Sequence, residues 1–234
     1  MNKARPNDSC PCGSGKKFKK CCAAADQNSR AAKTTAPASG LVKTAEEIEG
    51  IRRACRFNAE LMVYIKPRVV AGISTDQIDR WVHAYTLDHG HIPAPLNYHG
   101  FPKSVCTSLN SVVCHGIPSK MDILKEGDII NVDLTTIVDG FFGDQSETLY
   151  IGENICPEAR KVTEVSRESL KVALRTVRPD IALYEVCGAI QDYVEAHDCS
   201  VVREFTGHGI GRQFHEEPQV PHYRTPESKG VMLE

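Results

Sequence analysis

The stretch from Gly127 to Glu147, GDIINVDLTTIVDGFFGDQSE, constrains this chain more than any other. Apolar and mostly β-branched residues fill its front half, which is typical of a buried strand. Asp139-Gly140 then supplies a dipeptide that favours a tight hairpin turn. The returning strand is expected from Phe141 to Tyr150. The stretch therefore predicts two antiparallel strands joined by a short turn.

Two aspartates, Asp133 and Asp144, interrupt the apolar pattern of this hairpin. A buried carboxylate without a partner costs roughly several kcal/mol. Two of them on paired strands are best explained by a shared cation, because facing carboxylates are the ligands that hard divalent metals prefer. The hairpin alone leaves a second explanation open, in which both acids flank turns or cap backbone groups.

Three histidines add to this pattern. His208 lies between glycines in the segment TGHGIGRQFHEEP, where backbone and ligand can approach closely, and His215 follows seven residues later. His115 ends the apolar run of VCHGIP. A single histidine of this kind is more often structural or on the surface. Three of them beside strand ends, together with the aspartate pair, predict one common site.

Five segments together resemble type I methionine aminopeptidases: NYHGFPKSVCTSLNSVVCHGIP, NVDLT, GFFGDQS, GHGIG and FHEEP. The resemblance covers roughly Thr44 to the last residue. It implies an enzyme that removes the initiator methionine from the N-termini of nascent polypeptides. It also implies an α+β architecture called the pita-bread fold, in which pseudo-twofold helices cover one face of a curved antiparallel sheet.

The resemblance further implies a metal centre. In that family two divalent ions (cobalt, manganese, iron or zinc) are held by two Asp, one His and two Glu, and a water that bridges them becomes the nucleophile near neutral pH. Carried over to this sequence, the metal ligands are Asp133, Asp144 and His208. His115 would bind substrate near the scissile amide, and His215 would contact the carbonyl and stabilise the oxyanion.

A pocket for the methionine side chain is implied as well. Its residues would be apolar and partly sulfur-lined, with a histidine at the rim: Tyr98, His99, Phe101, Cys106 and Phe214. Each of them could instead be a core residue, and for Cys106 the two readings are equally open. Backbone carbonyls of Asn110 and Val112 match a monovalent-cation loop of some relatives. The family also implies that small residues follow methionine in the substrate.

The end of the sequence departs from the family pattern. Both Glu ligands of the family lie downstream of a Pro-Gly-Met segment, which should begin where this sequence ends at Glu234. Glu216 and Glu217 belong to the FHEEP motif and are not those ligands. A C-terminally incomplete copy is therefore expected, with a catalytically impaired fragment or a non-enzymatic binding module of the same fold as the alternative. A proline-specific dipeptidase fits less well, because that group usually carries a large extra N-terminal domain.

Four cysteines crowd the N-terminal segment PNDSCPCGSGKKFKKCC: Cys10, Cys12, Cys21 and Cys22. Four thiolates at this spacing predict one closed tetrahedral zinc site. So short a segment cannot build a core, so the metal would supply the folding energy. It resembles the small zinc motif of the SecA translocase, with Cys22 where that motif often has histidine. The alternative is a disordered tail with redox-labile thiols.

The same segment is basic, since six Lys and Arg oppose only Asp8 between residues 3 and 20. Such a surface could dock on ribosomal RNA or on an acidic protein, although a merely solvated set of charges is equally compatible. Residues 26–43 contain mostly small side chains, which predicts a flexible linker. The expected organisation is a zinc motif at 1–25, this linker, and a catalytic domain at 44–234.

Capping signals predict four helices: two that start at Thr44 and Ser74, and two that cover 159–177 and 183–197. With a shift of 108 residues, five positions of the first pair fall on like residues of the second. They are Ile73, Ile78, Val82, Tyr85 and His89, which fall on Ile181, Val186, Ile190, Tyr193 and His197. This weak internal repeat independently favours a pseudo-twofold domain.

Composition sets the remaining limits. The 234 residues suit one medium domain with a small appendage, and a monomer is expected. The sequence contains no run of 18 or more apolar residues, so no membrane span is expected. Six of the ten cysteines are scattered singly, which favours a reducing, cytoplasmic environment over a secreted disulfide framework. The net charge of −2 makes no general case for nucleic-acid binding.

Overall fold

The computed structural model describes residues 5–10, 15–21, 23 and 40–233. These divide into two compact units. Unit 1 holds the described residues of Met1–Ala38, Thr44–Ile155 and Gly211–Phe214. Unit 2 holds those of Ser39–Lys43, Cys156–Ile210 and His215–Glu234.

The predicted hairpin forms the centre of the sheet in unit 1. It consists of β3 (Ile129–Val138) and β4 (Phe141–Tyr150), paired antiparallel along their whole length. Two short strands, β1 (Ile92–Pro93) and β2 (Cys106–Leu109), pair antiparallel with the other edge of β3. Strand β3 therefore has partners on both sides, which explains its burial.

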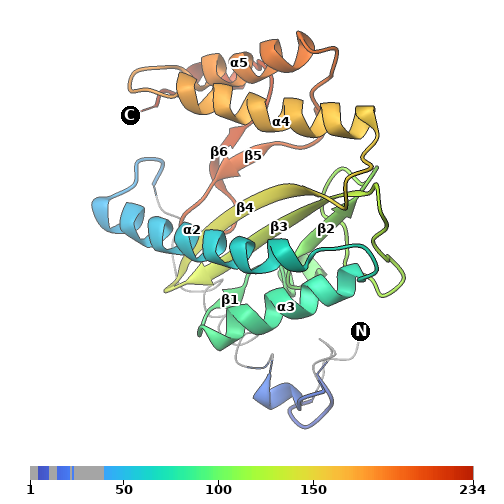
Figure 1. Ribbon diagram of the computed structural model, residues 1–234. Coiled ribbons are helices and arrows are strands. Elements are labelled where there is room, and N and C mark those ends of the chain that lie inside the picture. Colours follow the sequence, from blue (N-terminus) through green and yellow to red (C-terminus); the bar gives the residue numbers. More distant parts are fainter. Residues whose placement is uncertain (1–4, 11–14, 22, 24–39, 234) are drawn as a thin grey trace. The chain divides into compact units, whose positions relative to one another are not determined.

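Helices α2 (Ala45–Ile65) and α3 (Thr75–Asp88) lie along one side of this sheet (Figure 1). The predicted capping box at the start of α2 is confirmed, because Thr44 Oγ1 accepts from the Glu47 N–H and the Glu47 carboxylate accepts from the Thr44 N–H. The short helix η2 (Lys66–Arg68) follows α2 at Pro67. Ser74 caps α3 by accepting from the Gln77 N–H.

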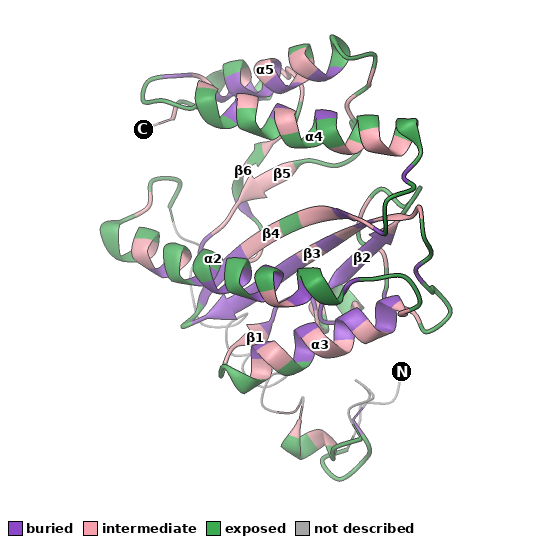
Figure 2. Ribbon diagram, viewed as in Figure 1, coloured by how far each residue is buried: buried purple, intermediate pink, exposed green. Residues whose placement is uncertain are grey.

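Alternation along β3 gives the sheet its two faces. Ile130, Val132 and Leu134 are fully buried and join the core cluster that includes α2 (Figure 2). On the same face, the buried Asn58 of α2 donates to the Leu134 carbonyl at 2.9 Å. Because successive strand residues point to opposite sides, the odd-numbered residues of β3 face away from these helices.

Unit 2 contains a helix pair and a small two-stranded sheet. The helices are α4 (Pro157–Thr176), with Pro157 in its first turn as predicted, and α5 (Leu183–Glu195). Their core cluster includes Val165, Ile181 and Ile190. Strands β5 (Gly207–Gly209) and β6 (Glu216–Val220) pair antiparallel, and the short helix η4 (Glu227–Gly230) follows.

Two further short helices complete the described elements, η1 (Phe18–Lys20) near the N-terminus and η3 (Tyr98–Gly100) in unit 1. In the described part of the chain, no helix combines the length and the apolar character that a membrane crossing requires.

Candidate active site

The register of the central hairpin places both aspartates on one face. Asp133 lies opposite Ser146, and Thr135 lies opposite Asp144. Directly opposite residues of an antiparallel pair share a face, and so do residues two apart on one strand. Both carboxylates therefore lie on the face turned away from α2. Thr135 Oγ1 donates to Asp144 Oδ1 at 2.9 Å, a role that the sequence analysis did not assign.

The electrostatics of this face fit a cation. Burial, followed by the negative charge of Asp144, raises the pKa of Asp133 to about 7. Burial and the charges of the two aspartates raise the pKa of the Cys106 thiol to about 12. A divalent ion would offset the charge repulsion that adds to both pKa shifts, and the donor set of carboxylate oxygens suits a hard metal. Within the described residues no three His, Cys, Asp or Glu side chains gather as a metal site.

The segment that carries His115 is fixed to β2 by a close backbone approach. A Cβ on Gly116 would lie 2.1 Å from the Thr107 carbonyl oxygen, so only glycine fits there. The Thr107 N–H donates to the Gly116 carbonyl at 2.9 Å. Burial and then the charge of Asp133 raise the pKa of the Cys114 thiol, so this segment borders the aspartate face. The exposed His115 has φ 54° at this turn.

Part of the predicted methionine pocket is brought together in unit 1. The ring of Phe214 lies 4.7 Å from that of Tyr98, which in turn lies 4.4 Å from that of His99. Phe142, which the sequence did not single out, stacks on Phe214 at 5.7 Å. The Phe142 N–H also donates to the Gly211 carbonyl at 2.8 Å, and this bond brings the distant segment to the sheet.

The other two predicted pocket residues lie nearby in the chain. Cys106 is buried in β2 directly opposite Asp133. Its side chain therefore lies on the same sheet face as the two aspartates. Phe101 is half-buried just after η3.

In unit 2, the two predicted histidines form a pair. The His208 and His215 rings lie 4.2 Å apart. The His208 Nδ1 lies 2.9 Å from the Gly209 carbonyl oxygen, and since a carbonyl only accepts, the neutral ring carries its proton there. This tautomer gives Nε2 the lone pair that a metal ligand needs. A Cβ on Gly209 would lie 2.3 Å from the Glu217 carbonyl oxygen, which explains the second glycine of the motif.

The linker and the FHEEP motif meet in unit 2. Lys43, at the end of the predicted linker, forms an ion pair with the buried Glu216 at 2.6 Å.

In unit 1, the Asn110 side chain donates to Asp128 and accepts from the Ile129 N–H, which fixes the predicted monovalent-cation loop at its start. Val112 of that loop donates its N–H to the Leu109 carbonyl.

The four-cysteine motif is described in part, because Cys12 and Cys22 lie outside the described residues. Its visible backbone folds back on itself: the Cys10 N–H donates to the Lys16 carbonyl at 2.9 Å, and the Phe18 N–H donates to the Asp8 carbonyl at 2.8 Å. Cys10 is buried. Cys21 Sγ lies 3.7 Å from Nε2 of His83 on α3.

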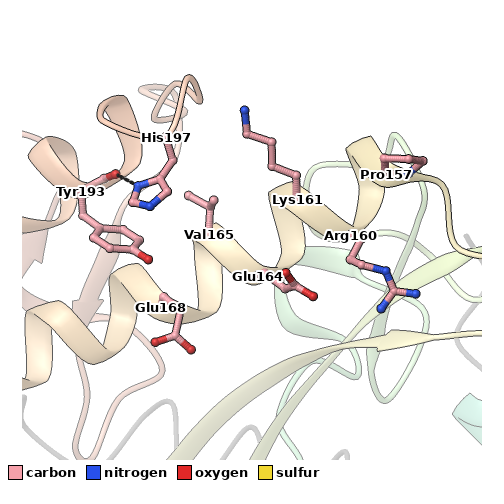
Figure 3. Close-up of a pocket in the computed structure, with 8 residues that line it drawn as sticks. All are labelled: Pro157, Arg160, Lys161, Glu164, Val165, Glu168, Tyr193 and His197. Atoms are coloured by element: carbon pink, nitrogen blue, oxygen red, sulfur yellow. Dashed lines mark hydrogen bonds between the residues drawn. The ribbon is translucent and has the colours of Figure 1, made fainter.

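A groove of about 420 Å³ lies between α4 and α5, and none of its lining residues is a predicted site residue (Figure 3). Its lining carries charges of both signs, and several of these already have ion-pair partners, such as Glu168 with Lys171 at 2.6 Å. Unit 1 has a corresponding groove of about 570 Å³ between α2 and α3. These grooves are features of the helix pairs rather than of the aspartate face.

Comparisons with known proteins give two family matches. The description metallopeptidase family M24 applies to residues 49–234, and the SEC-C motif matches residues 7–24. The chain is 48% identical to the methionine aminopeptidase of Haemophilus influenzae over 193 residues, which cover 82% of this chain and 72% of that protein. It is 50% identical to that of Escherichia coli K12 over 192 residues, with the same coverage.

Solved structures give the same fold. The crystal structure of methionine aminopeptidase from Rickettsia prowazekii superposes with a TM-score of 0.77 at 40% identity, covering 82% of this chain and 75% of that one. Prolidase from Pyrococcus furiosus superposes with a TM-score of 0.68 at 19% identity, covering 83% and 54%, and shares the fold alone. The predicted pita-bread fold is thereby confirmed.

Proposed function

We propose that this chain, which belongs to metallopeptidase family M24, removes the initiator methionine from new polypeptides by metal-dependent hydrolysis. The observation that carries the proposal is the aspartate pair. Asp133 and Asp144 share one sheet face, where burial, followed by the charges of the aspartates, raises the pKa of Asp133 and of Cys106. The high identity to methionine aminopeptidases supports the substrate class, and the non-enzymatic alternative is not favoured by it.

The residue roles follow from the chemistry of each side chain. Asp133, Asp144 and His208 would supply three of the ligands of a divalent metal site, and the metal would supply Lewis acidity and lower the pKa of water. His115 would contact the substrate near the scissile amide, and His215 would donate to the oxyanion that forms there. Tyr98, His99, Phe101, Cys106 and Phe214 would bind the methionine side chain, and a shallow pocket beyond it would admit only small second residues.

The test is turnover of peptides by protein expressed from its full reading frame with manganese supplied. Met-Ala-Ser should be cleaved after methionine, and Met-Lys-Ser should be cleaved at least about a hundredfold more slowly, because a long second side chain would clash. Cleavage of an Ala-Pro dipeptide in preference to Met-Ala-Ser would point instead to a proline-specific dipeptidase. Metal binding with no cleavage of either peptide would favour a binding module.

His115→Ala separates the two kinds of site residue. We expect turnover to fall about 10²- to 10³-fold while calorimetry still detects bound metal, because the imidazole acts on the substrate and not on the ions. Loss of metal from this variant would contradict the role assigned to His115.

The N-terminal motif would bind one structural zinc ion, which the SEC-C match supports. A peptide of residues 1–25, kept reduced at neutral pH, should bind about one equivalent of zinc. Less than about half an equivalent would contradict this proposal. The whole chain would then comprise the zinc motif at 1–25, the linker at 26–43 and the catalytic domain from 44 onward.

The basic charge of the motif would bring the enzyme to the ribosome in the cytoplasm, where nascent chains emerge. Arg5, Lys16, Lys17, Lys19 and Lys20 lie within its described residues. Co-sedimentation with ribosomes should weaken steeply with salt and should be lost when residues 1–25 are removed. Equal sedimentation of both proteins at every salt concentration would leave the catalytic domain as the contact.

Two further predictions have their own tests. Sedimentation velocity would measure the oligomeric state and so test the expected monomer. A potassium series in the peptide-cleavage assay would test the predicted cation loop at Asn110 and Val112.

A further inference from the structure

Three polar residues form a row along one face of α3. Asp76, Asp79 and His83 are spaced by three and four positions, so their side chains share a face of the helix. All three are buried, with exposed fractions of 6%, 3% and 5%. Burying two carboxylates is costly unless each has partners, so the contacts of this row should explain why it is there.

The three residues of the row bind the segment of residues 97–105, here called the substrate loop. This loop carries Tyr98, His99 and Phe101. Lys103 of this loop pairs with Asp76 at 2.5 Å and with Asp79 at 3.2 Å. The Ser104 N–H donates to Asp79 Oδ1 at 2.7 Å, and the Ser104 hydroxyl lies 2.8 Å from Nδ1 of His83. The loop is thus held at its backbone and at two side chains.

The substrate loop needs such support because its own backbone is strained. Asn97 and His99 have φ values of 66° and 46°, in the left-handed region that non-glycine residues rarely adopt. Conformations of this kind persist only when the surrounding structure holds them. Cys106, two residues after Ser104, begins β2 and pairs with Asp133. A shift of Ser104 would therefore reach both the methionine pocket and the aspartate face.

The first turn of α3 also holds the segment that follows His115. The Ser119 N–H donates to Thr75 Oγ1 at 2.8 Å, and the Asp76 N–H donates to the Ser119 carbonyl at 3.2 Å. The segments on either side of β2 are therefore both attached to α3.

The internal repeat shows that the row is not needed to build a helix of this kind. At the shift of 108 residues, the positions of Asp76, Asp79 and His83 on α3 correspond to Tyr184, Cys187 and Gln191 on α5. Helix α5 packs on α4 without a buried acid at any of these three positions. The acids occur only in the copy whose neighbouring loop carries the pocket residues.

We propose that Asp79, together with Asp76 and His83, is a positioning row that sets the substrate loop for recognition of the methionine side chain. This inference rests on the proposed aminopeptidase function. The row touches no reacting atom. It acts through Lys103 and Ser104, and its effect is therefore expected on substrate binding rather than on the chemical step.

The experiment compares Asp79→Asn with wild type in the full chain. We expect KM for Met-Ala-Ser to rise about tenfold with kcat within about threefold, since the pocket contacts substrate equally in the ground and transition states. Hydrogen exchange of the amides in residues 98–105 should become faster. Lys103→Arg, which keeps the charge between the two acids, should leave KM near the wild-type value.

Asp192→Asn is the matched control. Asp192 lies on α5, the helix that the repeat relates to α3, and its carboxylate pairs with Arg224. It should leave KM and loop exchange unchanged. Unchanged KM and exchange in Asp79→Asn would overturn the proposal, and so would a loss of kcat with unchanged KM. If Asp79→Asn does not fold, Ser104→Ala removes only the hydroxyl contact and decides by the same readouts.

Failure of the proposed function would look different. Wild-type protein would then cleave no peptide, while the exchange comparison between wild type and Asp79→Asn would still show whether the row holds the loop.

Discussion

The helix pairs α2–α3 and α4–α5 are built alike but differ in what they carry. In each pair, the loop before the second helix forms three backbone hydrogen bonds with a later segment, and the bonds correspond one to one. In unit 1 they run from Gly72 to Leu124, from Thr75 to Asp122 and from Leu124 to Ile73; in unit 2 they run from Asp180 to Leu233, from Leu183 to Val231 and from Leu233 to Ile181.

The likeness extends to the ends of the second helices. His89 stacks on Tyr85 with ring centroids 4.1 Å apart, and the His197 ring packs against Tyr193 with centroids 4.3 Å apart and the ring planes tilted by 36°. What differs among the described residues is the polar row, because Asp76, Asp79 and His83 on α3 correspond to Tyr184, Cys187 and Gln191 on α5. The comparison teaches that the repeated positions build the scaffold of both helix pairs, whereas the polar row on α3 lies at positions where the two copies differ.

The largest expected effect comes from removing an acid of the central hairpin. Asp133→Asn should lower turnover of Met-Ala-Ser by more than about a hundredfold, because a neutral amide is a weaker ligand for a hard ion and even outer-shell changes cost 10- to 100-fold. Calorimetry should show weakened metal binding. Asp192→Asn in unit 2 serves as the control and should retain full activity. Equal activity of the two variants would contradict the metal-ligand role proposed for Asp133.

Two glycines test how tightly each unit is packed. A Cβ on Gly143 in β4 would lie 2.5 Å from backbone atoms of Ala54, so α2 would have to move. We expect Gly143→Ala to lower the free energy of unfolding by about 2–3 kcal/mol. The three atoms nearest to a Cβ on Gly188 in α5 all belong to the guanidinium end of Arg224, at 2.5–2.7 Å, and this end of a flexible side chain can shift more easily than backbone.

Gly188→Ala should therefore either leave the free energy of unfolding unchanged or raise it by up to about 1 kcal/mol, since alanine is the better helix former. Urea denaturation measures both variants. A loss at Gly188 as large as that at Gly143 would mean that α5 is packed as rigidly as the central sheet.

Much of the fold could be predicted from the sequence because the signals are local. The bounds of β3 and β4 follow from the apolar run and the Asp-Gly turn, and the start of α2 follows from the Thr44 capping box. For the site, the spacing of the two aspartates on a hairpin suffices to place them on one face. Their joint role with His208 came from a family resemblance, and it stays a prediction.

The residues that the sequence did not reveal act through contacts between distant segments. Phe142 meets Phe214 only because the Gly211 backbone joins β4, and no local pattern marks such a bond. Asp76 and Asp79 read as ordinary acids at the start of an amphipathic helix, and their burial depends on a loop more than twenty residues later. Thr135 could have been found, since it lies two residues after Asp133 in a strand with period two.

A pH series tests the buried charge of the aspartate pair in unit 1. The raised pKa of Asp133, about 7, means that the folded metal-free protein keeps a proton that an unfolded carboxyl releases at about pH 3.9. The folded state then binds more protons between these two values, so stability should fall as pH rises from about 4 to about 7.

Urea midpoints of metal-free wild type and Asp133→Asn, measured at pH 5 and at pH 7.5, check this prediction. The wild type should lose more stability across that interval than the variant, and added manganese should stabilise wild type most at the higher pH. Parallel behaviour of wild type and variant would show that the repulsion between Asp133 and Asp144 is relieved in some other way.

The smallest effect should come from the positions where the two copies agree most closely. Nδ1 of His89 lies 2.8 Å from the Tyr85 carbonyl, and Nδ1 of His197 lies 2.7 Å from the Tyr193 carbonyl, so each ring satisfies one carbonyl in the last turn of its helix. Replacement by alanine removes that bond and the ring contact at an exposed site, where water can take over the carbonyl. His89→Ala and His197→Ala should therefore each cost about 0.5–1 kcal/mol, equally within error. Since neither histidine is a predicted site residue, neither change should alter KM or kcat. A cost above about 2 kcal/mol at one position alone would show that this shared feature supports one unit more than the other.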